Sequence, residues 1–304
     1  MKQYLLISNT IENKINNNML SYISNKLENI TFKKIKFREL SPQKAYELEL
    51  RDEDINLELK NFTVSFFSEN NIDCNFIKTS KNRKKKLLLA DMDSTIIKEE
   101  SLDELAKQIG KEKEIIRITK EAMNGRIDFK KALLKRVAIL KGQPVKILEE
   151  LKKNINFNEG AIELVKTMKY NNAITVLVSG GFTFLTDYIK TFLGFDYTHA
   201  NSLEIYQNNL NDMFLTGRVI NPILDKQSKV FFLDEYVSKN NFKYEDTICV
   251  GDGANDIDMI KKASLGISYN GKKILEESAN IHFKKTNLLG LLYAQGYSDK
   301  QIIS

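Results

Sequence analysis

Residues 86–98 restrict the fold more than any other stretch of the chain. Four apolar residues, 87–90, run without alternation into two aspartates, Asp91 and Asp93. A continuous apolar run of this kind predicts a strand buried on both faces, as in a parallel sheet. The carboxyl end of such a strand is where open α/β sheets bind their ligands. Because two neighbouring carboxylates repel each other unless a cation or a proton is present, the stretch indicates chemistry rather than packing.

The composition is that of a soluble globular protein with more than one domain. The chain has 304 residues, 42% of them hydrophobic and 28% charged, which is enough for a full core. The net charge is +6, from 46 basic and 40 acidic residues, and the densest basic run is 81–86. We favour a solvated linker over a nucleic-acid patch for this run, because the basic excess is not interleaved with aromatic residues. We therefore expect no nucleic-acid partner.

Cysteine usage and the lengths of the apolar runs indicate the compartment. Cys74 and Cys249 are far apart and flanked by apolar residues, and we interpret them as buried thiols in a reducing compartment. His199 and His282 lack a ligand partner at useful spacing, which argues against zinc. The first apolar run is too short for a signal peptide, and no later run approaches ~18 apolar residues. The sequence therefore predicts a cytoplasmic protein with no membrane partner.

Residues 1–82 are predicted to form an N-terminal domain that alternates strand and helix signals. The order β-α-β-β-α-β is that of a ferredoxin-like α+β module. The expected strands and helices cover residues 4–7, 15–27, 32–37, 45–50, 55–67 and 72–77. Since no reactive side chains cluster here, a scaffold or dimerisation module is favoured over an effector-binding one. A homodimer is therefore an open alternative.

Residues 99–157 are predicted to form a helical cap inserted directly after the paired aspartates. Ser101 and Glu104 have the spacing of a capping box, and Gly110 ends the helix that they begin. Three further short helices are expected over residues 112–124, 129–140 and 145–151, with Asp128 as an N-cap. The position of this small bundle suits a lid over the aspartates.

Residues 83–98 and 158–304 are predicted to form the catalytic core. Strands at 173–178, 247–250 and 265–269 alternate with helices. This rhythm predicts an α/β fold with a doubly wound, Rossmann-type parallel sheet and right-handed crossovers. A hairpin over 198–206 and 213–219 interrupts the alternation.

Three of the predicted strands end in polar groups. Asp91 and Asp93 follow the first, Ser179 with Gly180 and Gly181 follows the second, and the third is followed by Asp252, Asn255 and Asp256. Parallel strands bring their carboxyl ends to one edge, so these groups can converge. Carboxylates with few histidines form a hard-oxygen site suited to Mg²⁺. The hydroxyl and free amides of the Ser-Gly-Gly segment, placed before a helix, can form a phosphate cradle.

These groups predict phosphoryl transfer through a carboxylate nucleophile. Asp91, at the strand end, can attack phosphorus to form an aspartyl-phosphate. Asp93, two residues on, can give a proton to the leaving alkoxide and later take one from water. We expect Mg²⁺ to be held by Asp91, the backbone carbonyl of Asp93 and Asp252, with a lysine offsetting the phosphoryl charge.

Four segments in this order resemble the motifs of the haloacid dehalogenase superfamily. They are Asp91-Met-Asp-Ser-Thr95, Ser179-Gly-Gly181, a lysine in Asp225-Lys-Gln-Ser-Lys229, and Gly251-Asp-Gly-Ala-Asn-Asp256. Within the superfamily, residues 86–296 are most similar to the phosphoserine phosphatases. The resemblance implies that Lys229 binds phosphate with Ser179 and Gly180, that Asp252 is a metal ligand, and that Asn255 and Asp256 support the site, Asn255 toward the substrate.

The resemblance also implies which cap residues select the substrate. Glu100 and Arg136 match the positions that hold the substrate's ammonium and carboxylate groups, and Met123 and Phe129 match the residues that pack around them. Spacing alone favours a structural interpretation, with Glu100 as a helix cap, Arg136 as a solvated surface charge and the apolar pair as bundle core. The surrounding Thr119-Lys-Glu-Ala-Met-Asn-Gly125 match favours the substrate role.

The implied function is Mg²⁺-dependent hydrolysis of O-phospho-L-serine to serine and phosphate, the last step of serine biosynthesis. Two alternatives stay open. One is hydrolysis of another small phosphomonoester, or phosphoryl transfer from phosphoserine to homoserine. The other is a regulatory protein that uses its N-terminal module, which is similar to the ACT-type region of some bacterial phosphoserine phosphatases, while its phosphatase half is inert.

Overall fold

The computed structural model describes residues 2–12, 14–78, 82–123 and 126–304, without the side chain of Met123. It contains a four-stranded sheet of order β2-β3-β1-β4 and a seven-stranded sheet of order β11-β10-β9-β5-β6-β7-β8. The chain divides into a first unit, 1–89, 158–175 and 236–304, and a second unit, 90–157 and 176–235. The α/β fold class with a separate N-terminal α+β module is confirmed, whereas the three domain boundaries stay predictions.

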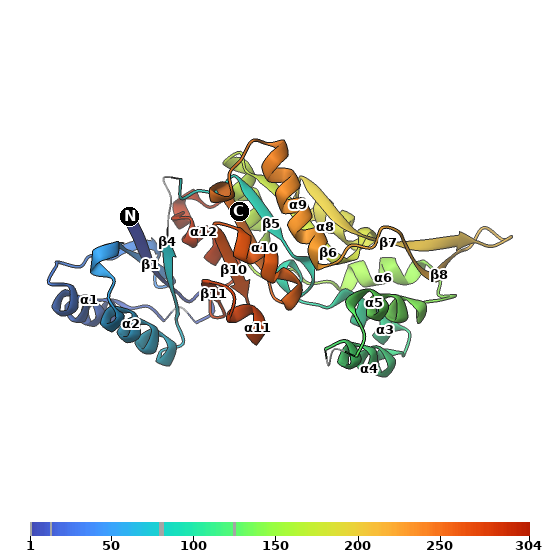
Figure 1. Ribbon diagram of the computed structural model, residues 1–304, viewed down its shortest axis with the longest axis horizontal. Coiled ribbons are helices and arrows are strands. Elements are labelled where there is room, and N and C mark those ends of the chain that lie inside the picture. Colours follow the sequence, from blue (N-terminus) through green and yellow to red (C-terminus); the bar gives the residue numbers. More distant parts are fainter. Residues whose placement is uncertain (1, 13, 79–81, 124–125) are drawn as a thin grey trace. The chain divides into compact units, whose positions relative to one another are not determined.

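The N-terminal module of the first unit has the expected order of elements. These are β1 (Lys2–Ser8), α1 (Asn17–Thr31), β2 (Arg38–Ser41), β3 (Ala45–Arg51), α2 (Leu57–Glu69) and β4 (Asp73–Lys78). Strand β1 pairs antiparallel with both β3 and β4, and the two helices lie on one face of this sheet (Figure 1). Asn16 and Asn56 begin the helices, because each side chain accepts a backbone N–H of the first turn.

The predicted strand at 32–37 is wrong. Helix α1 continues to Thr31 and ends at Phe32, which adopts a left-handed conformation (φ 54°) and donates its N–H to the carbonyl of Glu28. The strand β2 begins only at Arg38. The alternation of apolar residues and lysines in this stretch therefore marks a loop, and Phe32 is 92% exposed.

The N-terminal module is joined to strand β11 (Ile281–Phe283), which β4 contacts within the first unit (Figure 1). The amide side chain of Asn75 donates to the carbonyl of His282 (2.9 Å) and accepts the N–H of the same residue (2.8 Å). Asp73 accepts the N–H groups of Lys284 (3.0 Å) and Lys285 (2.8 Å). Side chains of β4 thus bond the backbone of β11 in the manner of a neighbouring strand.

The rest of the first unit is built on buried parallel strands. Strand β10 (Leu265–Tyr269) pairs parallel with β9 (Thr247–Gly251) and with β11. Every residue of β9, β10 and β5 (Leu87–Ala90) is buried, so the predicted buried strand at 87–90 is confirmed. The helices of this part are α7 (Ala161–Tyr170), α10 (Ile257–Lys262), α11 (Lys273–Glu276) and α12 (Gly290–Ala294).

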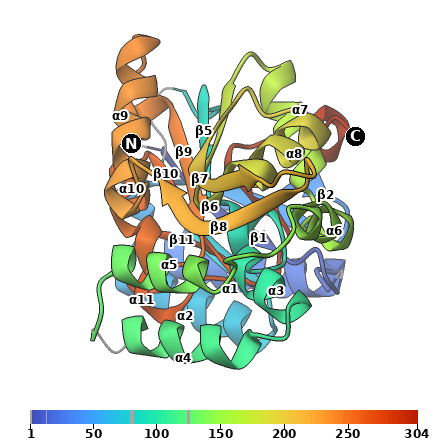
Figure 2. The same cartoon turned by 90° about the vertical axis from the view of Figure 1, so that its right-hand side faces the viewer.

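The second unit contains the four predicted cap helices. These are α3 (Ser101–Gln108), α4 (Glu112–Met123), α5 (Phe129–Ala138) and α6 (Lys146–Asn154), drawn in green in Figure 2. Leu105, Leu133 and Leu151 from three of these helices share one apolar cluster with Phe182 and Leu215 from the strands of this unit. The cap is therefore a packed bundle and not a loose insertion.

The strands of the second unit differ from the prediction at one functional point. Strand β6 (Ile174–Phe182) does not stop at Val178 but includes Ser179–Gly181, and α8 (Thr183–Leu193) begins directly after it. The register of β6 with β7 (Tyr197–Gln207) shifts between Val178 and Phe182, which resumes pairing with Asn201. The hairpin is confirmed: β7 pairs antiparallel with β8 (Met213–Ile220). Helix α9 (Lys226–Lys239) follows.

None of the helices in the described part of the chain is both long enough and apolar enough to span a membrane.

Candidate active site

The nucleophile predicted from the sequence lies in a buried ion pair. Asp91 is 4% exposed and begins the tight turn Met92–Ile96, whose first N–H it accepts (2.8 Å). Lys229, from α9 in the same unit, is 2% exposed and places its Nζ 2.7 Å from Oδ1 of Asp91. A buried charge pair is stable only if both members are present. The structure thus brings together the carboxylate and the lysine that are 138 residues apart in sequence.

Asp93 lies where burial and neighbouring negative charges favour the protonated form of its carboxyl group over the charged form. Enclosure by protein raises the pKa of Asp93 well above its ordinary value, and the negative charges of Glu100 and Asp91 raise it further. Its two oxygens accept the N–H (3.2 Å) and the hydroxyl (3.1 Å) of Ser101. A carboxyl group with a raised pKa holds its proton to a higher pH than an ordinary aspartate does, which suits it to act as a general acid.

The Ser-Gly-Gly segment lies against this carboxyl group. Ser179 is 2% exposed, and its hydroxyl accepts the N–H of Gly181 (2.8 Å). A Cβ at Gly181 would come within 3.0 Å of Ser179 Oγ and 3.2 Å of Asp93 Oδ2. A Cβ at Gly180 would come within 3.1 Å of the Phe129 ring. Only glycines allow the strand end, the acid and the cap to approach this closely.

The cap group consists of Glu100, Phe129 and Arg136. Glu100 is exposed, and its Oε1 accepts the hydroxyl of Ser94 (3.0 Å). Arg136 is half-buried, and its buried Nε has no hydrogen-bond partner among the described residues. Burial lowers the pKa of Arg136, and the nearby carboxyl groups, Asp103 and Glu100 foremost, offset only part of this effect. Phe129 is 39% exposed. The side chain of Met123 lies outside the described residues.

The predicted capping box at Ser101 and Glu104 is wrong. The N-cap of α3 is Glu100, whose side chain makes no capping hydrogen bond, and Ser101 is the first helical residue. The carboxyl group of Asp93, eight residues earlier, accepts the N–H of Ser101 in place of a local cap. Ser94 adopts a left-handed conformation (φ 54°), and its N–H bonds the carbonyl of Glu99. Sequence spacing gave no signal for the left-handed conformation of Ser94 or for the bonds from Ser101 to Asp93.

Asp252, Asn255 and Asp256 belong to the first unit and follow β9. Oδ2 of Asp256 accepts the N–H groups of Asp252 (3.1 Å) and Gly253 (3.0 Å), so it holds the turn that presents Asp252. Asn255 is half-buried in the same turn. Lys272, which the sequence did not single out, pairs with Asp252 at 3.0 Å. A lone exposed lysine gives no pattern by which it could be found.

Three of the acidic residues have the chemistry of metal ligands. Asp91, Asp252 and Asp256 are all buried, and carboxylate oxygens of this kind can hold a metal ion. Hard oxygen donors without thiols or imidazoles favour Mg²⁺ over softer metals. The donor set of the described residues therefore fits a divalent cation of the magnesium type.

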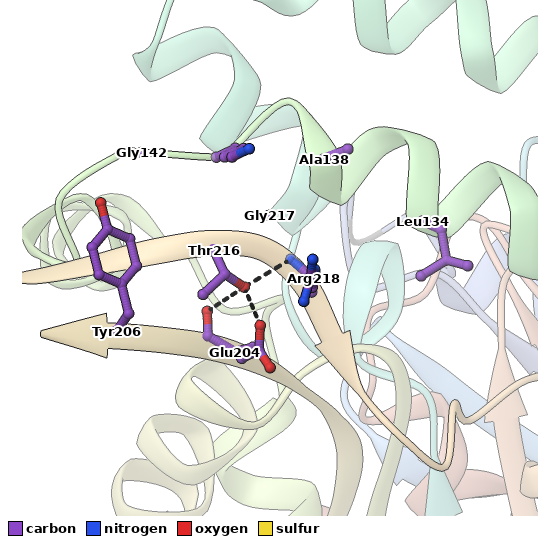
Figure 3. Close-up of a pocket in the computed structure, with 9 residues that line it drawn as sticks. Leu134, Ala138, Gly142, Glu204, Tyr206, Thr216, Gly217 and Arg218 are labelled. Carbon is purple, nitrogen blue, oxygen red and sulfur yellow. Dashed lines mark hydrogen bonds between the residues drawn. The ribbon is translucent and has the colours of Figure 1, made fainter.

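A separate cavity of about 670 Å³ lies in the second unit, between the end of α5 and the β7–β8 hairpin. Figure 3 shows Glu204 and Thr216 on its floor, where the Thr216 hydroxyl donates to the Glu204 carboxylate (2.7 Å). Leu134 and Ala138 line it from α5. None of the site residues predicted from the sequence lines this cavity.

Comparison with known proteins identifies the family. Residues 88–261 match the haloacid dehalogenase-like hydrolases. A phosphoserine phosphatase of Methanocaldococcus jannaschii is 42% identical over 210 residues, 69% of this chain and 97% of the relative. One of Archaeoglobus fulgidus is 43% identical over 69% of this chain, which spans only 60% of that relative. A solved haloacid dehalogenase family hydrolase of Salmonella enterica serovar Typhi superposes with a TM-score of 0.83 and 26% identity, covering 96% of this chain and 98% of the other.

The chain therefore belongs to the haloacid dehalogenase-like hydrolases. Within that family, the two relatives named above are phosphoserine phosphatases. The resemblance predicted from the four sequence motifs is confirmed.

Proposed function

We propose that this chain is a phosphoserine phosphatase, which hydrolyses O-phospho-L-serine to L-serine and phosphate. The observation that carries the proposal is the buried pair of Asp91 and Lys229, two residues before Asp93, whose pKa is raised and whose carboxyl oxygens are both bonded by Ser101. A carboxylate nucleophile, a cation and an acid two residues away are the parts that phosphomonoester hydrolysis through an aspartyl-phosphate requires. The names of the relatives support the substrate.

The chain's own residues account for both half-reactions. In the first, an oxygen of Asp91 attacks phosphorus, the bond from phosphorus to the serine oxygen breaks, and Asp93 gives its proton to that oxygen. Lys229 offsets the charge of the phosphoryl oxygens, and Ser179 with the Gly180 amide holds them. In the second, Asp93 takes a proton from water, which attacks phosphorus and releases Asp91 and phosphate.

We propose that the cofactor is Mg²⁺. Asp91, the backbone carbonyl of Asp93 and Asp252 would hold it, while Asp256 fixes the turn that carries Asp252. This ligand set is supported by the position of Asp91 and Asp252, each of which follows the carboxyl end of a buried strand, where open α/β sheets bind their ligands. When bound, the ion supplies positive charge that offsets the charge of the phosphoryl group.

Substrate recognition is assigned to the cap group. Arg136 has a buried Nε without a partner among the described residues, and the carboxylate of the substrate would accept a hydrogen bond from this forked guanidinium. Glu100 would bind the ammonium group, and Phe129 with Met123 would enclose the aliphatic part. Asn255 would contact the substrate from the turn after β9.

The test is phosphate release from phosphoserine by the purified chain, with Mg²⁺ and with excess chelator. We expect turnover only with Mg²⁺, and a loss of about 1000-fold or more in Asp91→Asn. Background release, or full turnover of Asp91→Asn, would contradict the proposal. Adding homoserine as a competing acceptor separates the phosphatase from a phosphotransferase, and a panel of small phosphomonoesters tests the substrate range.

The remaining roles also belong to this proposal. The proposed pathway is serine biosynthesis, because hydrolysis of phosphoserine yields serine. The proposed compartment is the cytoplasm. The N-terminal module is proposed as a scaffold, with a homodimer and effector binding as alternatives. Sedimentation of the full chain with and without serine measures both the oligomeric state and an effect of serine on it.

A further inference from the structure

Ser101 contacts the carboxyl group on which the proton transfers of the proposed function depend. Its N–H donates to Oδ1 of Asp93 (3.2 Å) and its hydroxyl donates to Oδ2 (3.1 Å). The two bonds engage both oxygens from one residue, so the carboxyl group cannot turn about its last torsion without breaking one of them. Ser101 is 1% exposed, so water does not replace its hydroxyl readily.

We infer that Ser101 is a positioning residue for the reaction: it holds Asp93 so that Oδ2 faces the phosphate cradle. The inference rests on the proposed phosphatase function and extends it to a residue of the cap. The geometry around Gly181 carries the inference, because the Cβ position of Gly181 lies 3.2 Å from Oδ2 of Asp93 and 3.0 Å from Oγ of Ser179. The oxygen bonded by the Ser101 hydroxyl is therefore the one directed at the cradle.

The hydroxyl of Ser101 is matched to both protonation states of Asp93. When Asp93 has given its proton to the serine oxygen of the substrate, the carboxylate accepts bonds from the hydroxyl and from the N–H. When Asp93 carries a proton on Oδ2, the same hydroxyl can rotate and accept a hydrogen bond from that group. The N–H of Ser101 continues to donate to Oδ1. An alanine at position 101 would keep the bond from the backbone N–H to Oδ1 and would lose the bond between the hydroxyl and Oδ2.

Ser101 also ties Asp93 to the cap. It is the first residue of α3, and α3 has no local side-chain cap, so Asp93 occupies the positive end of this helix. Leu105, one turn later, belongs to the apolar cluster of the cap together with Leu133 of α5. A displacement of α3 would withdraw both donors from Asp93, and the acid is therefore complete only while α3 keeps this position.

The same loop holds the proposed ammonium ligand. Ser94, next to Asp93, donates its hydroxyl to Glu100, next to Ser101 (3.0 Å). Ser94 therefore donates forward along the chain to Glu100, and Ser101 donates backward to Asp93. The acid and the ammonium ligand are thus fixed relative to each other by one short loop, which links correct substrate binding to the position of the acid.

The test compares Ser101→Ala and Ser101→Thr with the unchanged chain, using phosphoserine and p-nitrophenyl phosphate. Serine is a poor leaving group that needs the proton of Asp93, whereas p-nitrophenolate leaves without one. For phosphoserine, we expect Ser101→Ala to lower kcat about 10- to 100-fold with less than about threefold change in KM. Ser101→Thr, which retains the hydroxyl, should recover kcat to within about threefold.

Rapid-quench kinetics separate positioning from general damage. With p-nitrophenyl phosphate, Ser101→Ala should keep the rate of the first p-nitrophenolate burst and slow only the later turnover, in which Asp93 must activate water. Ser65→Ala, which removes an exposed hydroxyl of α2, should match the unchanged chain in both assays. Thermal melting of each variant checks that it is folded.

Three outcomes would overturn the inference: an unchanged kcat in Ser101→Ala, a loss confined to KM, or an equal loss of the burst rate. If the unchanged chain hydrolyses p-nitrophenyl phosphate but not phosphoserine, the proposed substrate is wrong. The burst and turnover of the aryl ester then still test Ser101.

Discussion

The second unit contains two groups of proposed site residues that differ in how completely the protein itself surrounds them. The strand-end group, Asp91, Asp93, Ser179 and Lys229, makes short contacts within the protein, including the 2.7 Å ion pair and the two bonds from Ser101. The cap group is more open: Glu100 is exposed, Phe129 is 39% exposed, and the Nε of Arg136 has no partner among the described residues.

The difference corresponds to two tasks. Groups that meet charge developing in a transition state are most effective when they are fixed in advance. Groups that bind the unreacting part of a substrate gain most when the substrate itself completes their hydrogen bonds. Substitutions in the strand-end group should therefore lower kcat, and those in the cap group should raise KM. Four predictions test this division, in order of decreasing effect.

Loss of Lys229 should have the largest effect. Lys229→Met removes the charge that we propose offsets the phosphoryl group, and it takes from the buried Asp91 the ammonium group 2.7 Å away. We expect kcat to fall about 1000-fold or more, and the free energy of unfolding of the metal-free chain to fall by about 3–5 kcal/mol. Steady-state kinetics and urea titration measure the two quantities. A change in KM alone would place Lys229 outside the reaction centre; Lys226→Met, three residues earlier in α9, is the matched control.

The two glycines of β6 give a matched pair across the boundary between the groups. A Cβ at Gly181 would press on Met92 (2.9 Å), Ser179 (3.0 Å) and Asp93 (3.2 Å), whereas at Gly180 the Phe129 ring (3.1 Å) is the one side chain of the described residues that it meets. Gly181→Ala should lower kcat about 100-fold, and Gly180→Ala should change KM about threefold, because a partly exposed ring can move aside. Equal changes in kcat and KM in the two variants would contradict the proposed difference between the strand-end group and the cap group.

Arg136→Ala tests the cap group directly. We expect KM for phosphoserine to rise about 10- to 100-fold, because a charge-assisted hydrogen bond to the substrate carboxylate is lost. The KM for phosphoethanolamine, which lacks that carboxylate, should change little. The neighbouring Lys135→Ala, which removes a solvent-accessible pair with Glu121 (3.7 Å), is the control. An equal rise for both substrates would count against the assignment.

The pH dependence of stability should show the smallest effect. Because the pKa of Asp93 is raised in the folded chain, the folded state binds more protons than the unfolded state above the ordinary pKa of an aspartate. Stability due to this group is complete below that ordinary value and is lost as the pH rises toward the raised one. In excess chelator, Asp93→Asn should melt a few degrees above the unchanged chain at pH 8, with little difference at pH 4. A difference independent of pH would contradict the cause.

The sequence predicted the elements whose signal is local and repeated. The buried strand at Leu87–Ala90 and the β7–β8 hairpin are confirmed, because apolar runs and turn residues specify them directly. The family could also be predicted, because four motifs in a fixed order are specific to one superfamily. The end of β6 could not be predicted. Ser179–Gly181 remain in strand conformation while the register between β6 and β7 shifts, and the pairing of the two strands determines that shift.

The contacts within the site were harder to predict. Ser101 and Glu104 have the spacing of a capping box, yet the N–H of Ser101 bonds Asp93, a competitor that the spacing does not reveal. Ser94 gave no sign of its left-handed conformation, and Lys272 gave none of its pair with Asp252. Each depends on a side chain brought near by folding, which a pattern along the chain cannot encode.

The side chains of Asn75 and Asp73 have a consequence for how the chain can be divided. Strand β11 is the last strand of the seven-stranded sheet, so among the described residues no further strand of that sheet bonds its outer backbone groups. Asn75 and Asp73 satisfy the N–H groups of His282, Lys284 and Lys285 and the carbonyl of His282. A catalytic half that starts at residue 83 would expose this edge to self-association. We therefore expect the N-terminal module to protect this edge from pairing with a second chain, whether or not the module binds an effector.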